Sequence, residues 1–199
     1  MFDKYGRTVK DTLLEPIIGA IPRWIHPNAI TVASLPFGIG AALCAAFGFR
    51  GWALALFVIN RILDGLDGFV ARRQERYSDF GGYLDMMVDF AVYAAVPIGV
   101  WYGATNGGTG SPWPLLVLLS VFYVNAASWL YLSALIEKRR ANARPEQNKT
   151  SIVMPVGIVE GTETLIFYLL FLTVPIYFRP LFFAMAIATA AGVVQRMVW

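Results

Sequence analysis

The sequence predicts an all-α, polytopic membrane protein with six transmembrane helices and an N-terminal amphipathic juxtamembrane helix. Composition is the first reason. Hydrophobic residues make up 57% of the 199 residues and charged residues only 15%, whereas soluble domains carry about 25% charged residues. The second reason is that six apolar stretches are each long enough to cross about 30 Å of hydrocarbon at roughly 1.5 Å per residue. We expect residues 1–199 to form a single domain.

The N-terminal segment, residues 1–26, is predicted to be a helix that lies on the membrane surface. Its apolar residues recur at helical spacing between cationic flanks, which is typical of interfacial helices. An N-terminal arm packed against the bundle is an equally good interpretation. The segment lacks the apolar core of a signal peptide, so we expect targeting to come from the transmembrane helices.

The six transmembrane helices are predicted near residues 29–48, 52–71, 80–103, 114–136, 152–174 and 177–197, which form a bundle over residues 27–199. Their orientation follows from the cationic residues, which concentrate on the cytoplasmic side of membrane proteins. With six spans both termini lie on one side, and the opposite side holds only Arg50 and Arg179. This bias predicts a multi-pass protein of the plasma membrane whose termini and 72–79 and 137–150 loops face the cytoplasm.

Four aspartates lie at or near the ends of two apolar segments, in the sequence DGLDGFVARRQERYSDFGGYLDMMVD at residues 64–89. A charge in hydrocarbon costs about 2.5 to 3.5 kcal/mol, and several like charges cost more unless cations neutralise them. Helical geometry of about 100° per residue places Asp64 and Asp67 on one stripe and Asp85 and Asp89 on another. A short loop makes the two helices antiparallel neighbours, so the carboxylates can converge on one cavity.

Clustered carboxylates favour a hard divalent cation such as Mg²⁺, Mn²⁺ or Ca²⁺, and the sequence offers no His or Cys cluster for zinc. Gly68, Ala71 and Gly81 are small where the helices would face each other, and Arg72 could donate to a phosphate in a forked geometry. The alternative interpretation is an interfacial salt-bridge cluster between these aspartates and the nearby arginines Arg61, Arg72, Arg73 and Arg76.

At these residues the sequence resembles the CDP-alcohol phosphotransferase (CDP-alcohol phosphatidyltransferase) family. The family signature D-x2-D-G-x2-A-R-x8-G-x3-D-x3-D is met at every position, by Asp64, Asp67, Gly68, Ala71, Arg72, Gly81, Asp85 and Asp89. The stretch from Pro27 to Thr31 also resembles the family's Pro-Asn-x-x-Thr sequence, although an ordinary helix start is the better explanation of that stretch taken alone.

The resemblance implies a Mg²⁺-dependent membrane enzyme of phospholipid biosynthesis. It would transfer a phosphatidyl (phosphoalcohol) group from a CDP-linked donor, such as CDP-diacylglycerol, to a hydroxyl acceptor and release CMP. Two Mg²⁺ ions are implied, with Mn²⁺ as an alternative. Asp64, Asp67 and Asp85 would hold the first, Asp85 and Asp89 the second, and Asp89 would also act as general base. The residues implied at the nucleotide and the donor are Asn28, Thr31, Gly68, Ala71, Arg72, Ser78 and Gly81. The family also implies a homodimer in membrane lipid.

The acceptor alcohol is not identified by the sequence. The basic loop at residues 137–151 carries Lys138, Arg139 and Arg140, which would suit a phosphorylated acceptor. Ordinary positive-inside bias and contact with anionic lipid explain the same residues. Glu160 and Glu163 lie in the fifth predicted span, where an acid is expected to contact a polar cavity, an arginine or an acceptor hydroxyl.

Two other classes of function stay open. A cation transporter or channel would need polar residues that continue across the bilayer, but the second span is apolar from Trp52 to Ile59. A structural or scaffolding bundle would tolerate alanine at all four aspartates. A nucleic-acid partner is not expected.

Overall fold

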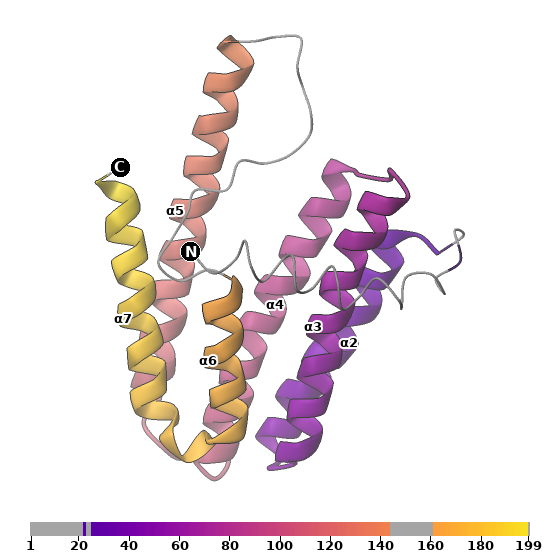
Figure 1. Cartoon of the computed structure of the whole chain (residues 1–199). Helices are drawn as coiled ribbons and strands as arrows, with labels where there is room; N and C mark the ends of the chain where they lie inside the picture. The colour runs from indigo at the N-terminus through magenta and orange to yellow at the C-terminus, as the bar shows by residue number, and fades with distance from the viewer. Residues whose placement is uncertain (1–21, 23–24, 144–160, 199) are drawn as a thin grey trace.

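The computed structural model of the chain describes residue 22, residues 25–143 and residues 161–198. This part holds six α-helices and a short 3-10 helix (Figure 1). They are α2 (Pro27–Ala46), α3 (Arg50–Arg73), α4 (Asp79–Ala104), α5 (Trp113–Ala143), α6 (Gly161–Thr173), η1 (Pro175–Tyr177) and α7 (Phe178–Met197). The all-α prediction is confirmed. The surface helix predicted within residues 1–26 falls almost entirely outside the described residues and stays a prediction.

Four of the described helices are long and apolar enough to cross a membrane: α2, α4, α5 over Trp113–Arg139, and α7 together with η1. Helix α6 is apolar but has only 13 described residues. Helix α3 has 24 residues and is about 36 Å long, but ionisable side chains interrupt its apolar surface. The chain is therefore a polytopic membrane protein, and a total of six crossings stays a prediction.

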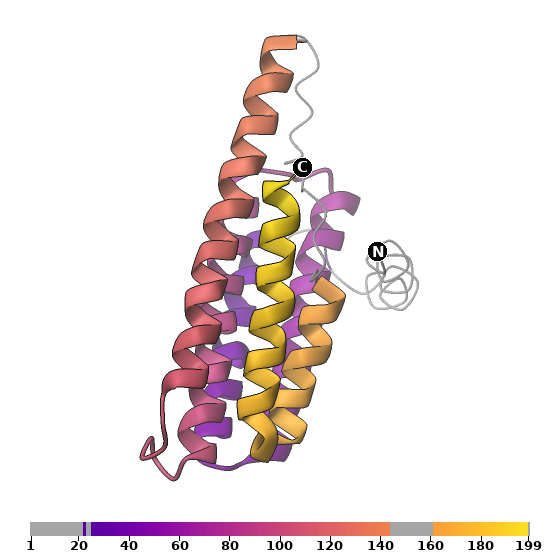
Figure 2. The same ribbon diagram turned by 90° about the vertical axis from the view of Figure 1, so that its left-hand side faces the viewer.

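Successive helices run in opposite directions, so the bundle has two distinct ends (Figure 1). One end holds the start of α2, the turn between α3 and α4, the end of α5 and the end of α7. We call it the basic end, because the described cationic residues gather there: Arg72, Arg73, Arg76, Lys138, Arg139 and Arg196. The opposite end holds Arg50 and Arg179. Helix α5 extends past the other helices at the basic end (Figure 2).

Small residues bring α2 and α4 into close contact. A Cβ atom added at Gly99 of α4 would lie 2.1 Å from the carbonyl oxygen of Ala42, and one added at Gly103 would lie 2.3 Å from that of Ala45. Small residues at a helix interface allow backbones to approach closely in a membrane. This packing fixes α4 against α2, and with it the positions of the polar residues that the two helices carry toward the basic end.

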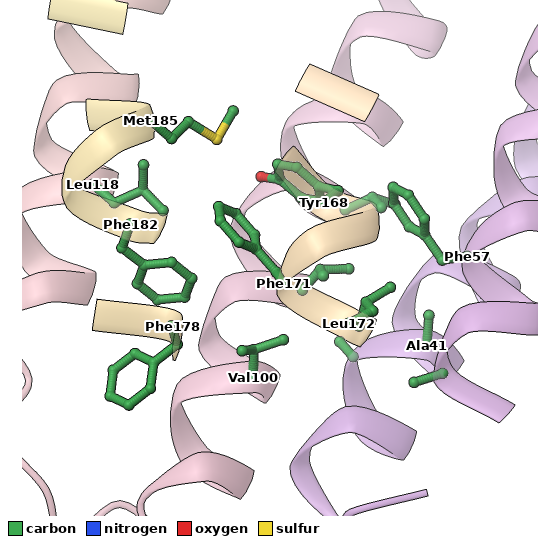
Figure 3. Packing of buried hydrophobic residues seen from close by; sticks show 14 of the residues in the cluster. Ala41, Phe57, Val100, Leu118, Tyr168, Phe171, Leu172, Phe178, Phe182 and Met185 are labelled. Atoms are coloured by element: carbon green, nitrogen blue, oxygen red, sulfur yellow. The ribbon is translucent and has the colours of Figure 1, made fainter. Parts of the chain in front are cut away.

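Aromatic side chains fill the centre of the bundle and connect α3 to α6 and α7 (Figure 3). Phe57 stacks on Tyr168 with ring centroids 5.6 Å apart, and Tyr168 lies 5.3 Å from Phe171. Phe171 then meets Phe182 edge to face at 4.8 Å. All four rings are fully buried, so they join the two halves of the bundle through an apolar core.

Candidate active site

The four aspartates of the sequence motif come together between α3 and α4, in the halves of these helices that lie toward the basic end. The charges of Asp64 and Asp67 act on Asp85, and those of Asp64 and Asp85 act on Asp89. Asp67 is only 3% exposed, while the side chains of Asp64 and Asp89 are half-buried. We call these four residues the aspartate cluster.

Arg61 of α3 is a cation inside this cluster. Its Nη1 lies 2.9 Å from Asp89 Oδ1 and 3.7 Å from Asp64 Oδ2, and its side chain is only 11% exposed. The interpretation of the aspartates as salt-bridge partners therefore holds for Arg61. One guanidinium can offset one of four carboxylate charges, which leaves room for further cations at the cluster.

A polar network holds Arg61 from the side away from the basic end. Its Nε donates to Asn60 Oδ1 at 2.8 Å and its Nη1 donates to the Tyr93 hydroxyl at 3.0 Å. The amide nitrogen of Asn60, a fully buried residue, donates to the carbonyl oxygen of Ser34 on α2 at 2.9 Å. Neither Asn60 nor Tyr93 was predicted as a site residue from the sequence. Tyr93 continues the four-residue steps of Asp85 and Asp89 along α4, a signal that could have found it.

Thr31 and Asp67 form a buried polar contact between α2 and α3. The Thr31 hydroxyl donates to Asp67 Oδ2, and the two residues are 4% and 3% exposed. A buried carboxylate needs such donors to compensate for lost hydration. Thr31 was predicted to contact the nucleotide or the CDP-linked substrate. In the structure it lies where it orients the carboxylate of Asp67.

Three of the residues predicted at the nucleotide lie together where α2 and α4 begin. Ser78 caps α4, and its Oγ accepts a hydrogen bond from the Gly81 amide at 3.0 Å. A Cβ atom added at Gly81 would lie 3.0 Å from both Asn28 Oδ1 and Ser78 Oγ. Glycine is therefore the residue that lets Asn28 approach the first turn of α4. At the neighbouring Gly82, an added Cβ would meet nothing within 4 Å.

Gly68, Ala71 and Arg72 lie together near the end of α3. The Arg72 guanidinium lies over the preceding turn of α3, where its Nη1 is 3.6 Å from a Cβ added at Gly68. Its Cζ also lies 5.6 Å from the centroid of the Phe69 ring. Ala71 is half-buried. The absence of larger side chains at Gly68 and Ala71 leaves the Arg72 guanidinium beside the aspartate motif, where it can meet an anionic ligand.

The residues predicted for the acceptor are more scattered. Lys138 and Arg139 are exposed near the end of α5. Glu163 is half-buried in the first turn of α6. The Arg140 side chain and Glu160 lie outside the described residues. The three described side chains, Lys138, Arg139 and Glu163, thus belong to α5 and α6, whereas the aspartate cluster belongs to α3 and α4.

The donor set of the cluster suits a divalent cation. In the described part of the chain, no three His, Cys, Asp or Glu side chains are already arranged to enclose a metal ion. Mg²⁺ does not require such an enclosure, because it commonly keeps several waters and binds one or two carboxylates together with substrate phosphates. The hard oxygen ligands and the surplus of negative charge fit Mg²⁺ or Mn²⁺.

Comparison with known proteins gives the same family as the motif. The model of the CDP-alcohol phosphatidyltransferase family matches residues 24–195. The chain is 35% identical over 155 residues to the inner membrane protein YnjF of Escherichia coli, covering 77% of this chain and 72% of that protein. It is 30% identical over 206 residues to an archaetidylinositol phosphate synthase of Methanothermobacter thermautotrophicus, covering 96% and 95%.

Solved structures share the fold. The phosphatidylinositol phosphate synthase of Mycobacterium tuberculosis with CDP-DAG bound superposes with a TM-score of 0.65 at 21% identity, covering 96% of this chain and 91% of that one. The same enzyme in complex with manganese and citrate gives 0.64 at 20% identity, covering 96% and 87%. At these identities the likeness establishes the fold alone.

Proposed function

The chain belongs to the CDP-alcohol phosphatidyltransferase family, and we propose that it transfers a phosphatidyl group from CDP-diacylglycerol to a hydroxyl acceptor with release of CMP. It is thus a membrane transferase of phospholipid synthesis. The observation that carries the proposal is the meeting of Asp64, Asp67, Asp85 and Asp89 between α3 and α4. The choice of donor is supported by the similar enzyme of Mycobacterium tuberculosis, whose structure contains CDP-DAG.

The donor is proposed to bind where α2 and α4 begin. Asn28, Ser78 and Gly81 meet there, at the first turn of α4. Such helix starts favour phosphates, because the unpaired N–H groups and the helix dipole both attract negative charge. Arg72 would donate to the diphosphate, and Gly68 and Ala71 would leave space for it.

The metal ligands are proposed from the motif and the geometry of the cluster. Asp64, Asp67 and Asp85 would hold one Mg²⁺ or Mn²⁺ ion, and Asp85 and Asp89 would help to hold a second. The manganese complex of the similar enzyme supports the type of ion. When bound, the ions would neutralise the diphosphate and stabilise the leaving CMP.

The reaction is proposed to be a single in-line displacement. The acceptor oxygen forms a bond to the phosphorus that carries the lipid, and the bond from that phosphorus to the bridging diphosphate oxygen breaks. CMP leaves with that electron pair. Asp89, held by Arg61, takes the hydroxyl proton as the acceptor attacks. Thr31 keeps Asp67 oriented throughout.

The interior of the bundle supports an enzyme over a cation path. Beyond Arg61, the buried rings of Phe57, Tyr168 and Phe171 fill the space between α3 and α6. Among the described residues, the carboxylates thus end at an apolar core. A site with an apolar core on its inner side suits a reaction on a lipid-linked substrate better than ion flow.

The site is proposed to face the cytoplasm, since it lies at the basic end of the bundle. Single cysteines in a Cys44→Ser background test this orientation with a membrane-impermeant maleimide on intact cells. Ser111→Cys at the opposite end should react. Arg76→Cys, in the turn next to the cluster, should react only after the cells are opened. The reverse pattern would show that the site faces the outside.

Product analysis of the purified protein tests the proposed reaction. CDP-diacylglycerol and Mg²⁺ are supplied with polyols, phosphorylated polyols and amino alcohols, and the lipid products are identified by mass. We expect CMP and one new phospholipid, whose mass names the acceptor, and loss of both with EDTA or with Asp89→Asn. Absence of CMP with every acceptor would refute the proposal. Size-exclusion chromatography with light scattering checks the proposed homodimer.

A further inference from the structure

We propose that Arg61 is a positioning residue for Asp89, which it holds toward the acceptor hydroxyl and away from full coordination to the metal ions. The inference rests on the proposed function, because it concerns the proton acceptor of that reaction. The family motif begins at Asp64 and assigns no role to Arg61, Asn60 or Tyr93. Their arrangement in the structure is what suggests one.

The first observation is that two of the three guanidinium nitrogens of Arg61, Nε and Nη1, have polar partners, while the buried Nη2 has no hydrogen-bond partner among the described residues. Its Nη1 lies 2.9 Å from Asp89 Oδ1 and 3.0 Å from the Tyr93 hydroxyl, while Nε donates to Asn60 at 2.8 Å. Asp64 is farther, at 3.7 Å. The guanidinium thus contacts Asp89 more closely than Asp64. A planar guanidinium fixed at several donors sets the direction of the carboxylate that it binds.

The second observation is that the partners of Arg61 are themselves fixed. Asn60 is fully buried and tied to the backbone of α2 through its hydrogen bond to Ser34. The backbone carbonyl of Tyr93 accepts a hydrogen bond from the Tyr168 hydroxyl of α6 at 2.6 Å. Arg61 Cζ also lies 5.2 Å from the centroid of the Tyr93 ring. Three neighbouring helices therefore hold the guanidinium that in turn holds Asp89.

The consequence is that the four aspartates of the cluster have different roles. Asp64, Asp67 and Asp85 stay available to a cation, while part of Asp89 is engaged by Arg61. A positive group at the cluster also repels a bound metal ion. Loss of the Arg61 guanidinium should therefore slow the reaction without lowering the affinity for the metal ion. A purely structural role for Arg61 predicts the opposite, since a disturbed site binds metal more weakly as well.

The experiment compares Arg61→Gln, Arg61→Lys and Tyr93→Phe with wild type, using the full chain in detergent. Arg50→Gln, at an exposed position on the opposite end, is the control. Three quantities are measured: kcat and KM for CMP release, Mn²⁺ affinity of the protein alone by calorimetry, and the melting temperature. Tyr93→Phe removes a single hydroxyl, so it tests the proposal even if Arg61→Gln does not fold.

We expect Arg61→Gln to lower kcat by about 10- to 100-fold, the usual effect of removing a group that orients a metal-site ligand. KM for the donor should stay near the wild-type value, and Mn²⁺ should bind as tightly as to wild type or more tightly. Arg61→Lys should restore part of kcat. Tyr93→Phe should lower kcat to a smaller extent with Mn²⁺ affinity near the wild-type value, and Arg50→Gln should match wild type.

Two results would overturn the inference while leaving the proposed function intact. One is wild-type kcat in both Arg61→Gln and Tyr93→Phe. The other is a parallel loss of kcat and Mn²⁺ affinity in Arg61→Gln. A wild-type protein that neither binds Mn²⁺ nor releases CMP would overturn the proposed function together with this inference.

Discussion

Replacing Thr31 by valine removes the hydroxyl that α2 donates to Asp67 on α3 while keeping the shape of the side chain. Both residues are almost completely buried, at 4% and 3% exposure, so water cannot replace the lost donor. The structure thus predicts that this substitution acts on the aspartate cluster itself and not only on helix packing.

The size of the effect follows from the chemistry of the pair. Hydrogen bonds between membrane helices average about 0.6 kcal/mol and reach about 1.7 kcal/mol. Hydrogen bonds to charged groups contribute about 1.5 to 3 kcal/mol. The hydrogen-bond acceptor here is the buried carboxylate of Asp67. We therefore expect Thr31→Val to remove about 1.5 kcal/mol of hydrogen-bond free energy, a value at which the two ranges overlap. That loss corresponds to about a tenfold weaker Mn²⁺ affinity.

Calorimetric Mn²⁺ binding to purified Thr31→Val measures this loss, and Thr189→Val is its matched control. Thr189 is also buried, at 3% exposure, but its hydroxyl has no hydrogen-bond partner among the described residues. Thr189→Val should therefore leave Mn²⁺ affinity unchanged and should not lower stability. Equal Mn²⁺ affinities in the two variants would refute the reasoning that Thr31 orients a metal ligand.

Two further predictions use glycines with matched controls. Gly81→Ala places a methyl group 3.0 Å from two side-chain oxygens at the start of α4. It should weaken donor binding by about 1 to 3 kcal/mol and so raise KM for CDP-diacylglycerol, whereas Gly82→Ala should leave KM unchanged. Enzyme kinetics that fail to distinguish these two variants would contradict the proposed donor site. Gly99→Leu forces α4 away from α2 and should lower the melting temperature in detergent, whereas Gly51→Leu, at a position where an added Cβ meets nothing within 4 Å, should leave it unchanged.

The sequence predicted the helices and the stripe of aspartates because both depend on local periodicity. Apolar runs mark what can cross a bilayer, and steps of three and four residues place Asp64 with Asp67 and Asp85 with Asp89 on shared faces. Hydropathy does not show where a helix ends once it continues beyond the membrane into water. The fourth span was predicted to end at residue 136, but α5 continues to Ala143, because the polar residues that follow are good helix formers.

The contacts between helices could not be predicted in the same way. The Thr31 hydroxyl reaches Asp67 only because α2 docks closely on α3 and α4, and no periodicity within one helix specifies its neighbour. Likewise, the sequence offered several arginines as partners for the aspartates, but the ion pair of Arg61 with Asp89 is set by tertiary packing. The hydrogen bond from Asn60 to the carbonyl oxygen of Ser34 on α2 depends on the same packing.

The central claim is that the carboxylates facing each other across α3 and α4 activate a CDP-linked donor. The most direct test is the rate of CMP release from CDP-diacylglycerol by Asp85→Asn, compared with Arg50→Gln, at an exposed position on the opposite end of the bundle. We predict no detectable release from Asp85→Asn and the wild-type rate from Arg50→Gln. Release at the wild-type rate from Asp85→Asn would contradict the claim.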